Sequence, residues 1–252
     1  MKNLKGELTT QQIVLLIILI ASFSIILFFF FKLNLGEETQ KTICHNSVIL
    51  KGSVVSSLSG GNLDCRTNYL CISGGGKCEG INPTETVKVD SGNKNEVLKA
   101  IADEMADCWW MFGEGKIDYV GATEKALGTN VCAACSIVKF DKKIQESIGN
   151  ISYEELINEG LNKPKDSQET YLSYLYGVNS ITELYDKFEV IKEDVESKKV
   201  LTLDGRFMIR TGFAKGAFFG KIGFDPNTII YPYIFETNDI PNPQCDKFIT
   251  KA

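Results

Sequence analysis

The most reactive pattern in the sequence is Cys132-Ala133-Ala134-Cys135, in which two residues separate two cysteines. Such a pair catalyses thiol–disulfide exchange when its first thiol lies at a helix N-terminus, where the helix dipole lowers the pKa of the thiol. The residues that follow, 136–140, are strand-like, so the sequence predicts no such helix. We therefore expect Cys132 and Cys135 each to form a disulfide with a different distant cysteine, and an oxidoreductase that uses this pair is the alternative.

The sequence lacks the residue spacing that metal binding or cysteine–histidine catalysis requires. Structural zinc sites usually contain two closely spaced cysteine pairs, whereas this chain has one such pair and a single histidine, His45. Cys44 precedes His45, but neighbouring side chains point apart and cannot form a catalytic dyad. We predict no metal, no cofactor and a satisfied or exposed histidine.

A group of acids beside two tryptophans resembles the residue set of a carbohydrate-processing cleft, where two carboxylates flank a glycosidic bond. The acids are Asp103, Glu104, Asp107 and Glu114, and the tryptophans are Trp109 and Trp110. At helical spacing, however, the acids fall on the face opposite the apolar residues. We expect a solvated acidic face, a buried Trp109 and a partly exposed Trp110, so no catalytic residue is assigned.

Residues 13–31 form an uncharged, almost wholly apolar run that is long enough to cross the ~30 Å hydrocarbon core of a bilayer as a helix. The run exceeds the apolar core of a cleavable signal peptide and ends in Phe31-Lys32 without a small-residue cleavage site. We predict a retained anchor that contacts the lipid bilayer. The expected division is a cytoplasmic head at 1–12, an anchor at 13–32, a Cys/Gly-rich β-like segment at 33–90 and the ectodomain core at 91–252.

Charge and cysteine distribution predict the sidedness of this anchor. The net charge of −5 disfavours nucleic acid as a partner, because nucleic-acid binding depends on basic patches. The short basic head favours a cytoplasmic N-terminus. All eight cysteines follow the apolar run, as expected for a disulfide-bonded domain in an oxidising, extracytoplasmic space. The disulfide candidates are Cys44, Cys65, Cys71, Cys78, Cys108, Cys132, Cys135 and Cys245, with Cys71 and Cys78 close enough to staple the glycine loop between them.

The elements that position these residues predict an α+β fold. Apolar residues at three- and four-residue steps indicate a central helix over 95–112, capped by Gly113. We expect a strand at 131–140, a helix opened by Asp141, and capping boxes at Ser152 and Ser180. Short helices are expected at 153–161, 171–176 and 181–189. Asn150 begins an N-glycosylation sequon.

Strand patterns are expected on both sides of the helical middle. Short strands are predicted at 47–50 and 69–72, and Asp204-Gly205 predicts a hairpin between 200–203 and 206–211. A last strand at 228–237 contains Pro232, which indicates a sheet edge or a bulge.

The N-terminal residues Lys5-Gly6-Glu7-Leu8-Thr9-Thr10-Gln11-Gln12, followed by the apolar run, resemble the class III signal of archaeal type IV pilin-like proteins. The resemblance implies cleavage after Gly6, with Glu7 as the new N-terminus. The stretches around Trp109 and Cys132 also resemble uncharacterised membrane proteins of small-genome archaea. Together these observations predict a single-pass, extracytoplasmic structural or binding protein of the cell envelope with pilin-like features, rather than an enzyme.

Overall fold

The computed structural model describes residues 10–32, 39–52, 63–120, 129–214, 228–238 and 245–251, and the chain divides into two units, Met1–Thr39 and Gln40–Ala252. The first unit contains helix α1 (Thr10–Lys32). The large apolar side chains of α1 between Ile13 and Ile26 are 46–63% exposed. In the part of the chain that the structure describes, no helix is both long enough and apolar enough to cross a membrane.

The second unit combines a mixed β-sheet with helices, which confirms the predicted α+β class. Its elements are α2 (Gln40–Gly52), β1 (Asn68–Ser73), β2 (Glu85–Lys88), α3 (Lys94–Met111), η2 (Gly113–Gly115), β3 (Val131–Phe140), α5 (Lys142–Ile148), β4 (Asn150–Ser152), α6 (Tyr153–Glu155), η3 (Leu156–Leu161), α7 (Tyr171–Tyr176), α8 (Ile181–Lys187), α9 (Glu189–Glu196), β5 (Val200–Thr202), β6 (Phe207–Ala214), β7 (Thr228–Glu236) and β8 (Lys247–Phe248).

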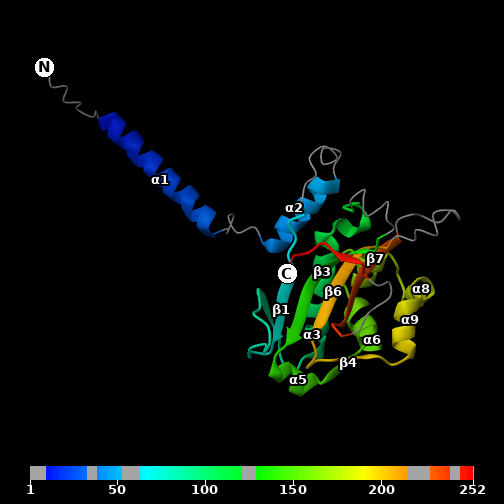
Figure 1. Cartoon of the computed structure of the whole chain (residues 1–252). Coiled ribbons are helices and arrows are strands. Elements are labelled where there is room, and N and C mark those ends of the chain that lie inside the picture. The colour runs from blue at the N-terminus through cyan, green and yellow to red at the C-terminus, as the bar shows by residue number, and fades with distance from the viewer. Residues whose placement is uncertain are drawn as a thin grey trace. The chain divides into compact units, whose positions relative to one another are not determined.

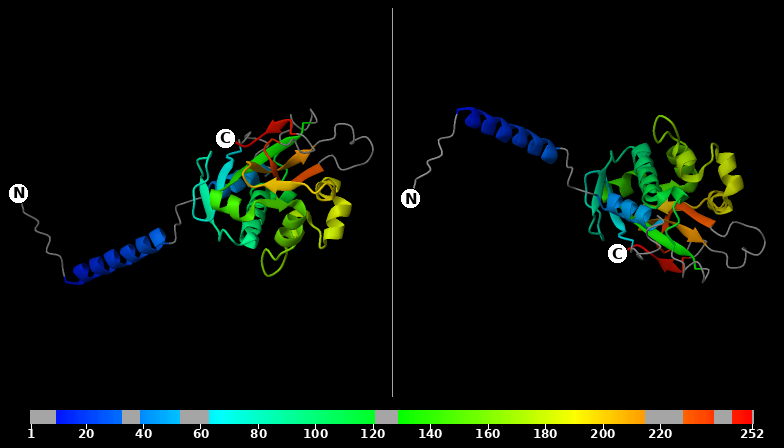
Figure 2. Two further views of the ribbon diagram at one scale, coloured as in Figure 1. Left: turned by 90° about the horizontal axis from the view of Figure 1, so that it is seen from below. Right: turned by 90° about the horizontal axis from the view of Figure 1, so that it is seen from above.

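The main sheet has the strand order β2-β1-β3-β6-β7, and β8 pairs with the start of β3. Strand β1 runs parallel to β2 and β3, whereas β6 runs antiparallel to β3 and β7. Helix α3 and the later helices α6, α8 and α9 lie on one face of this sheet (Figure 1 and Figure 2). A separate two-stranded sheet pairs β4 with β5.

Helix α3 is the central element of the core, as its periodicity predicts. It packs against β3, β6 and β7, and Val97, Leu98 and Ile101 are fully buried. Gly113 follows the helix with a φ of +75°, a left-handed conformation that glycine adopts at helix C-termini. The predicted core face of this helix is therefore confirmed.

Local capping signals also place the short helices correctly. The side chain of Asp141 accepts a hydrogen bond from the backbone N–H of Ile144 and begins α5, and Ser152 forms the capping box of α6. Ser180 caps α8 by accepting from the N–H of Glu183, but the predicted capping box is not formed, because the Glu183 carboxylate accepts from the N–H of Asn179 instead of that of Ser180. Gly177 ends α7 in the left-handed region. Each signal depends only on residues within one helical turn, which explains why it can be recognised in the sequence.

One predicted strand and one predicted hairpin pairing are wrong. Residues 47–50 belong to α2, whose Cys44 and Val48 lie one turn apart and are both buried. Residues 200–203 and 206–211 do not form a hairpin, because β5 pairs with β4 whereas β6 joins the main sheet. The expected turn does exist, since the N–H of Gly205 donates to the carbonyl of Thr202, but the two strands diverge after it.

Strand β7 confirms the prediction made from Pro232. It is the last strand along the order of the main sheet, so a residue without an N–H leaves few ladder bonds unmade. The register between β6 and β7 also shifts opposite this position, between Arg210 and Gly212.

Candidate functional site

All eight cysteines are consumed in four disulfides: Cys44–Cys65, Cys71–Cys78, Cys108–Cys135 and Cys132–Cys245. The short ring of Cys71 and Cys78 is the predicted staple. Disulfides persist in oxidising compartments, so this number of them indicates an extracytoplasmic domain. No thiolate is left to ligate zinc or to act as a nucleophile.

The Cys132-x-x-Cys135 pair is structural in this fold. Cys135 is bonded to Cys108 of α3, whereas Cys132 is bonded to Cys245, 113 residues away. Both side chains are fully buried within β3. A redox pair would need its two sulfurs bonded to each other and accessible, so the prediction of separate distant partners is confirmed.

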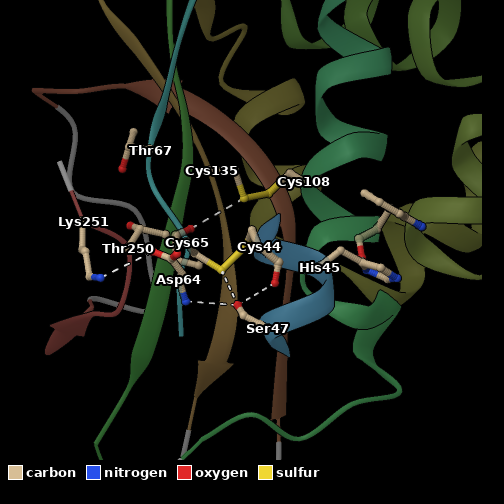
Figure 3. The surroundings of a disulfide bond; sticks show 12 residues. Cys44, His45, Ser47, Asp64, Cys65, Thr67, Cys108, Cys135, Thr250 and Lys251 are labelled. Atoms are coloured by element: carbon tan, nitrogen blue, oxygen red, sulfur yellow. Dashed lines mark hydrogen bonds and ion pairs between the residues drawn. A yellow bond between two sulfur atoms is a disulfide. The ribbon is translucent and has the colours of Figure 1, made fainter. Parts of the chain in front are cut away.

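His45 is a satisfied structural residue. Its Nδ1 lies 2.7 Å from the carbonyl oxygen of Trp110, and its ring stacks on the Trp110 ring at a centroid distance of 3.9 Å. The neighbouring Cys44 is bonded to Cys65, whose sulfur also lies near the Ser47 hydroxyl (Figure 3). These contacts fix α2 to the rest of its unit.

The prediction that Glu104 is solvated is wrong, because α2 covers this part of α3. Glu104 is 3% exposed, and one carboxylate oxygen accepts from the Lys41 ammonium at 2.7 Å. The other accepts from the Ser136 hydroxyl, with Asn68 Nδ2 at 3.4 Å. Burial by itself lowers the pKa of Lys41, but the carboxylates of Glu104 and Asp107 raise it well above its usual range.

The remaining acids of the set have different partners. Asp103 pairs with Lys99 on the exposed surface and accepts from the Tyr171 hydroxyl, while Asp107 pairs with Lys41. These contacts give both side chains a structural role. In the described part of the chain, Glu114 of this set lines a cavity, together with Trp109.

This cavity has a volume of about 440 Å³, within the range of small-molecule sites. It lies between η2, α7, the end of α8 and the start of β7. We call it the aromatic cleft. Its main side chains are Trp109, Glu114, Glu169, Tyr174, Lys187 and Tyr231.

Glu114 is held in the cleft by an unusual backbone. It has a φ of +55° between Gly113 at +75° and Gly115 at +69°, so three consecutive residues adopt positive φ angles. A Cβ at Gly115 would lie 2.8 Å from the ring of Trp109, which explains a glycine there. A left-handed conformation costs a residue with a side chain on the order of 1 kcal/mol, and such strain concentrates at functional sites.

The Glu114 carboxylate is ionised and oriented by two donors. Tyr174 donates its hydroxyl at 2.8 Å, and the Lys116 ammonium lies 2.5 Å from the other oxygen. Partial burial acts to raise the pKa of Glu114, but these hydrogen bonds outweigh burial and lower it. Burial and the Glu114 hydrogen bond raise the pKa of Tyr174, which keeps that hydroxyl protonated as a donor.

One wall of the cleft is aromatic. The Tyr231 ring stacks on Trp109 at 5.4 Å and meets Phe188 edge-on at 4.9 Å. Lys187 donates to the carbonyl of Tyr176 and lies 5.8 Å from the Tyr231 ring centroid. The wall therefore presents aromatic surface beside a fixed ammonium group.

Sequence reasoning missed most of this cleft. Tyr174 and Glu169 come from the α7 region, Lys187 from α8 and Tyr231 from an edge strand, so no linear spacing connects them. The one local signal is Gly113-Glu114-Gly115, where two glycines flank an acid at the end of a helix. That pattern can predict a left-handed turn that displays a carboxylate.

Of the two candidate modification sites, the glycosylation sequon lies within the described residues and the cleavage site does not. Asn150 is exposed at the start of β4, where a glycan can be attached. Gly6 and Glu7 lie outside the residues that the structure describes.

No family model, curated protein or solved structure matches the chain. The disulfides, helix α1 and the aromatic cleft are the features of the chain that bear on its function.

Proposed function

We propose that the protein is a single-pass, membrane-tethered binding protein of the cell envelope, with the aromatic cleft as its ligand site. Residues 13–31 lie in the bilayer, the N-terminus is cytoplasmic, and residues 40–252 form an extracytoplasmic domain. The large apolar side chains of α1 between Ile13 and Ile26 are exposed, and water solvates such a surface poorly. The apolar run continues in the sequence to Phe31, which gives the length of one bilayer crossing.

The observation that supports binding is the strained position of Glu114. An exposed loop with no ligand to recognise would gain stability from a third glycine at this position. Instead, the chain retains an acid there and orients it with Tyr174 and Lys116. A pre-organised polar group in a partly aromatic cavity is what a ligand site requires.

Binding is favoured over hydrolysis by the protonation state of Glu114. A glycoside hydrolase needs one carboxyl whose pKa is raised so that it can donate a proton at neutral pH. The pKa of Glu114 is lowered, the opposite of that requirement. The pairing of Cys132 and Cys135 with other cysteines likewise gives the oxidoreductase alternative no support.

The tether and the orientation can be tested together on the full chain. Two arginines in the run, Leu16→Arg and Ile20→Arg, each oppose insertion by about 2.5–3.5 kcal/mol. We expect this variant to be lost from carbonate-washed membranes, whereas a matched control with Val190→Arg and Val200→Arg, both exposed apolar residues of the second unit, stays membrane-bound.

Labelling of intact cells decides the orientation. An amine reagent that cannot cross the membrane should label lysines within residues 40–252 of the parent chain. Labelling that occurs only after lysis contradicts the proposed orientation. Extraction of the parent chain by carbonate contradicts the proposed tether.

A further inference from the structure

We propose that the aromatic cleft binds an uncharged carbohydrate. This inference rests on the proposed function and on the side chains that line the cleft. Three properties of the lining carry this inference. They are the balance of its charges, the position of the Lys187 ammonium group and the combination of ring surface with polar groups.

The formal charges of the described lining residues cancel. Glu114 and Glu169 are balanced by Lys116 and Lys187. Glu114 is also ion-paired with Lys116 at 2.5 Å, and Glu169 lies 3.9 Å from Lys165. Because the lining as a whole carries no net formal charge, the cleft offers an ionic ligand no net attraction to offset the loss of its own hydration.

The aromatic wall also disfavours a cationic ligand. Rings bind cations through their faces, but the Lys187 ammonium already lies 5.8 Å from the Tyr231 centroid and 5.5 Å from that of Phe188. The Lys165 ammonium lies 4.3 Å from the Tyr174 centroid. A second positive charge at these rings would be repelled by the first.

A neutral ligand rich in hydroxyls fits the same groups. Sugar hydroxyls both donate and accept, so one hydroxyl of the ligand can donate to the Glu114 carboxylate while another accepts from the Lys187 ammonium. The half-buried Tyr231 ring offers an apolar surface for the C–H face of a sugar ring. Hydrogen bonds to charged groups are the stronger kind, which lets a small neutral ligand be held in a solvated cleft.

The experiment uses the full chain in lipid nanodiscs, because sugar-based detergents would compete for the site. A printed array of neutral and of sialylated, sulfated or phosphorylated oligosaccharides is the probe, followed by calorimetric titration with the neutral disaccharide that gives the highest signal. Glu114→Gln keeps the shape of the side chain and removes its charge, and Lys187→Met removes the ammonium group. Lys192→Met is the matched control, since Lys192 belongs to an exposed pair on α9.

We expect neutral oligosaccharides to bind and the affinity to fall about tenfold or more in both cleft variants, the loss of one charge-assisted hydrogen bond. The control should bind like the parent chain. Thermal unfolding monitored by circular dichroism verifies that each variant is folded. Should one cleft variant fail to fold, the other provides the comparison.

The inference is overturned if no neutral oligosaccharide binds at about 10 mM, if only charged ones bind, or if folded Glu114→Gln and Lys187→Met bind like the parent. The conclusions about the membrane tether and the orientation do not depend on these results, because the extraction and labelling experiments test them separately.

Discussion

Replacing Lys41 by methionine tests whether a buried charge network fixes α2 to α3. Lys41 is 17% exposed at its side chain and contacts Glu104 and Asp107 at 2.7 Å each, with Glu85 at 3.0 Å. Removing the ammonium leaves the Glu104 carboxylate buried without its charged partner. Breaking a buried ion pair from one side costs about 3–5 kcal/mol.

The environment of Glu104 places the expected loss near the lower end of that range. Its carboxylate keeps the hydrogen bond from Ser136 and the longer one from Asn68, so it is not left unsolvated. We expect Lys41→Met to lower the free energy of unfolding by about 3 kcal/mol. Adding Glu104→Gln should recover a large part of this loss, because the second change removes the uncompensated charge.

The assay is urea unfolding of the full chain in detergent, followed by tryptophan fluorescence at pH 7. Lys99→Met is the control, because Lys99 and Asp103 form an exposed pair one helical turn apart on α3. Such pairs contribute roughly 0.2–0.5 kcal/mol. Equal losses for Lys41→Met and Lys99→Met, or no recovery in the double variant, would refute the network.

Three further predictions can be tested. Trp109→Ala should lose about 3–5 kcal/mol in the same urea assay, because Trp109 is 6% exposed, while Trp110→Ala should lose clearly less; equal losses would contradict the core assignment. Asp141 is buried, and although burial acts to raise its pKa, hydrogen bonds from the N–H groups of Ile144 and Gly76 and from the Ser73 hydroxyl lower it. Its contribution is therefore complete above an unfolded pKa of about 4 and is lost as the pH falls through the lower folded pKa. Asp141→Asn should destabilise the protein at pH 7 and flatten the stability loss below about pH 4; an unchanged acid profile in urea unfolding would refute this. N-terminal sequencing of the mature chain should begin at Glu7 if the pilin-like signal is processed, and an intact Met1 would contradict the predicted cleavage after Gly6.

The sequence predicts those parts of the fold that depend on neighbouring residues. The buried face of α3 follows from the spacing of Val97, Leu98 and Ile101, and the caps at Asp141 and Ser152 follow from a single turn each. The separate partners of Cys132 and Cys135 follow from the strand-like residues after them. Such signals depend on residues close together in the sequence, and here they agree with the packing of the rest of the chain.

Errors arise where distant segments decide the outcome. Residues 47–50 are apolar enough for a strand, but Cys44–Cys65 and the packing of α2 on α3 make them helical. The same packing buries Glu104 beside Lys41, which no spacing within α3 could reveal. Strand β5 finds its partner in β4, some fifty residues earlier, rather than in the next strand.

The cleft was beyond sequence reasoning for the same reason. Four separate elements supply Glu114, Tyr174, Lys187 and Tyr231, and their proximity exists only in the folded sheet and helices. Helical spacing predicts that Glu114 continues the solvated face of α3 and that Trp109 lies on its core face. The left-handed turn at Glu114 instead takes that residue off the helix, so that it lines the cleft together with Trp109.

Disulfide mapping is the most direct test of an extracytoplasmic, disulfide-bonded binding domain. Free thiols are alkylated in intact cells, and the purified chain is digested without reduction and analysed by mass spectrometry. The account predicts four cross-linked peptide pairs, Cys44–Cys65, Cys71–Cys78, Cys108–Cys135 and Cys132–Cys245, with no alkylated cysteine. Alkylated cysteines throughout the chain, or a Cys132–Cys135 cross-link, would contradict it.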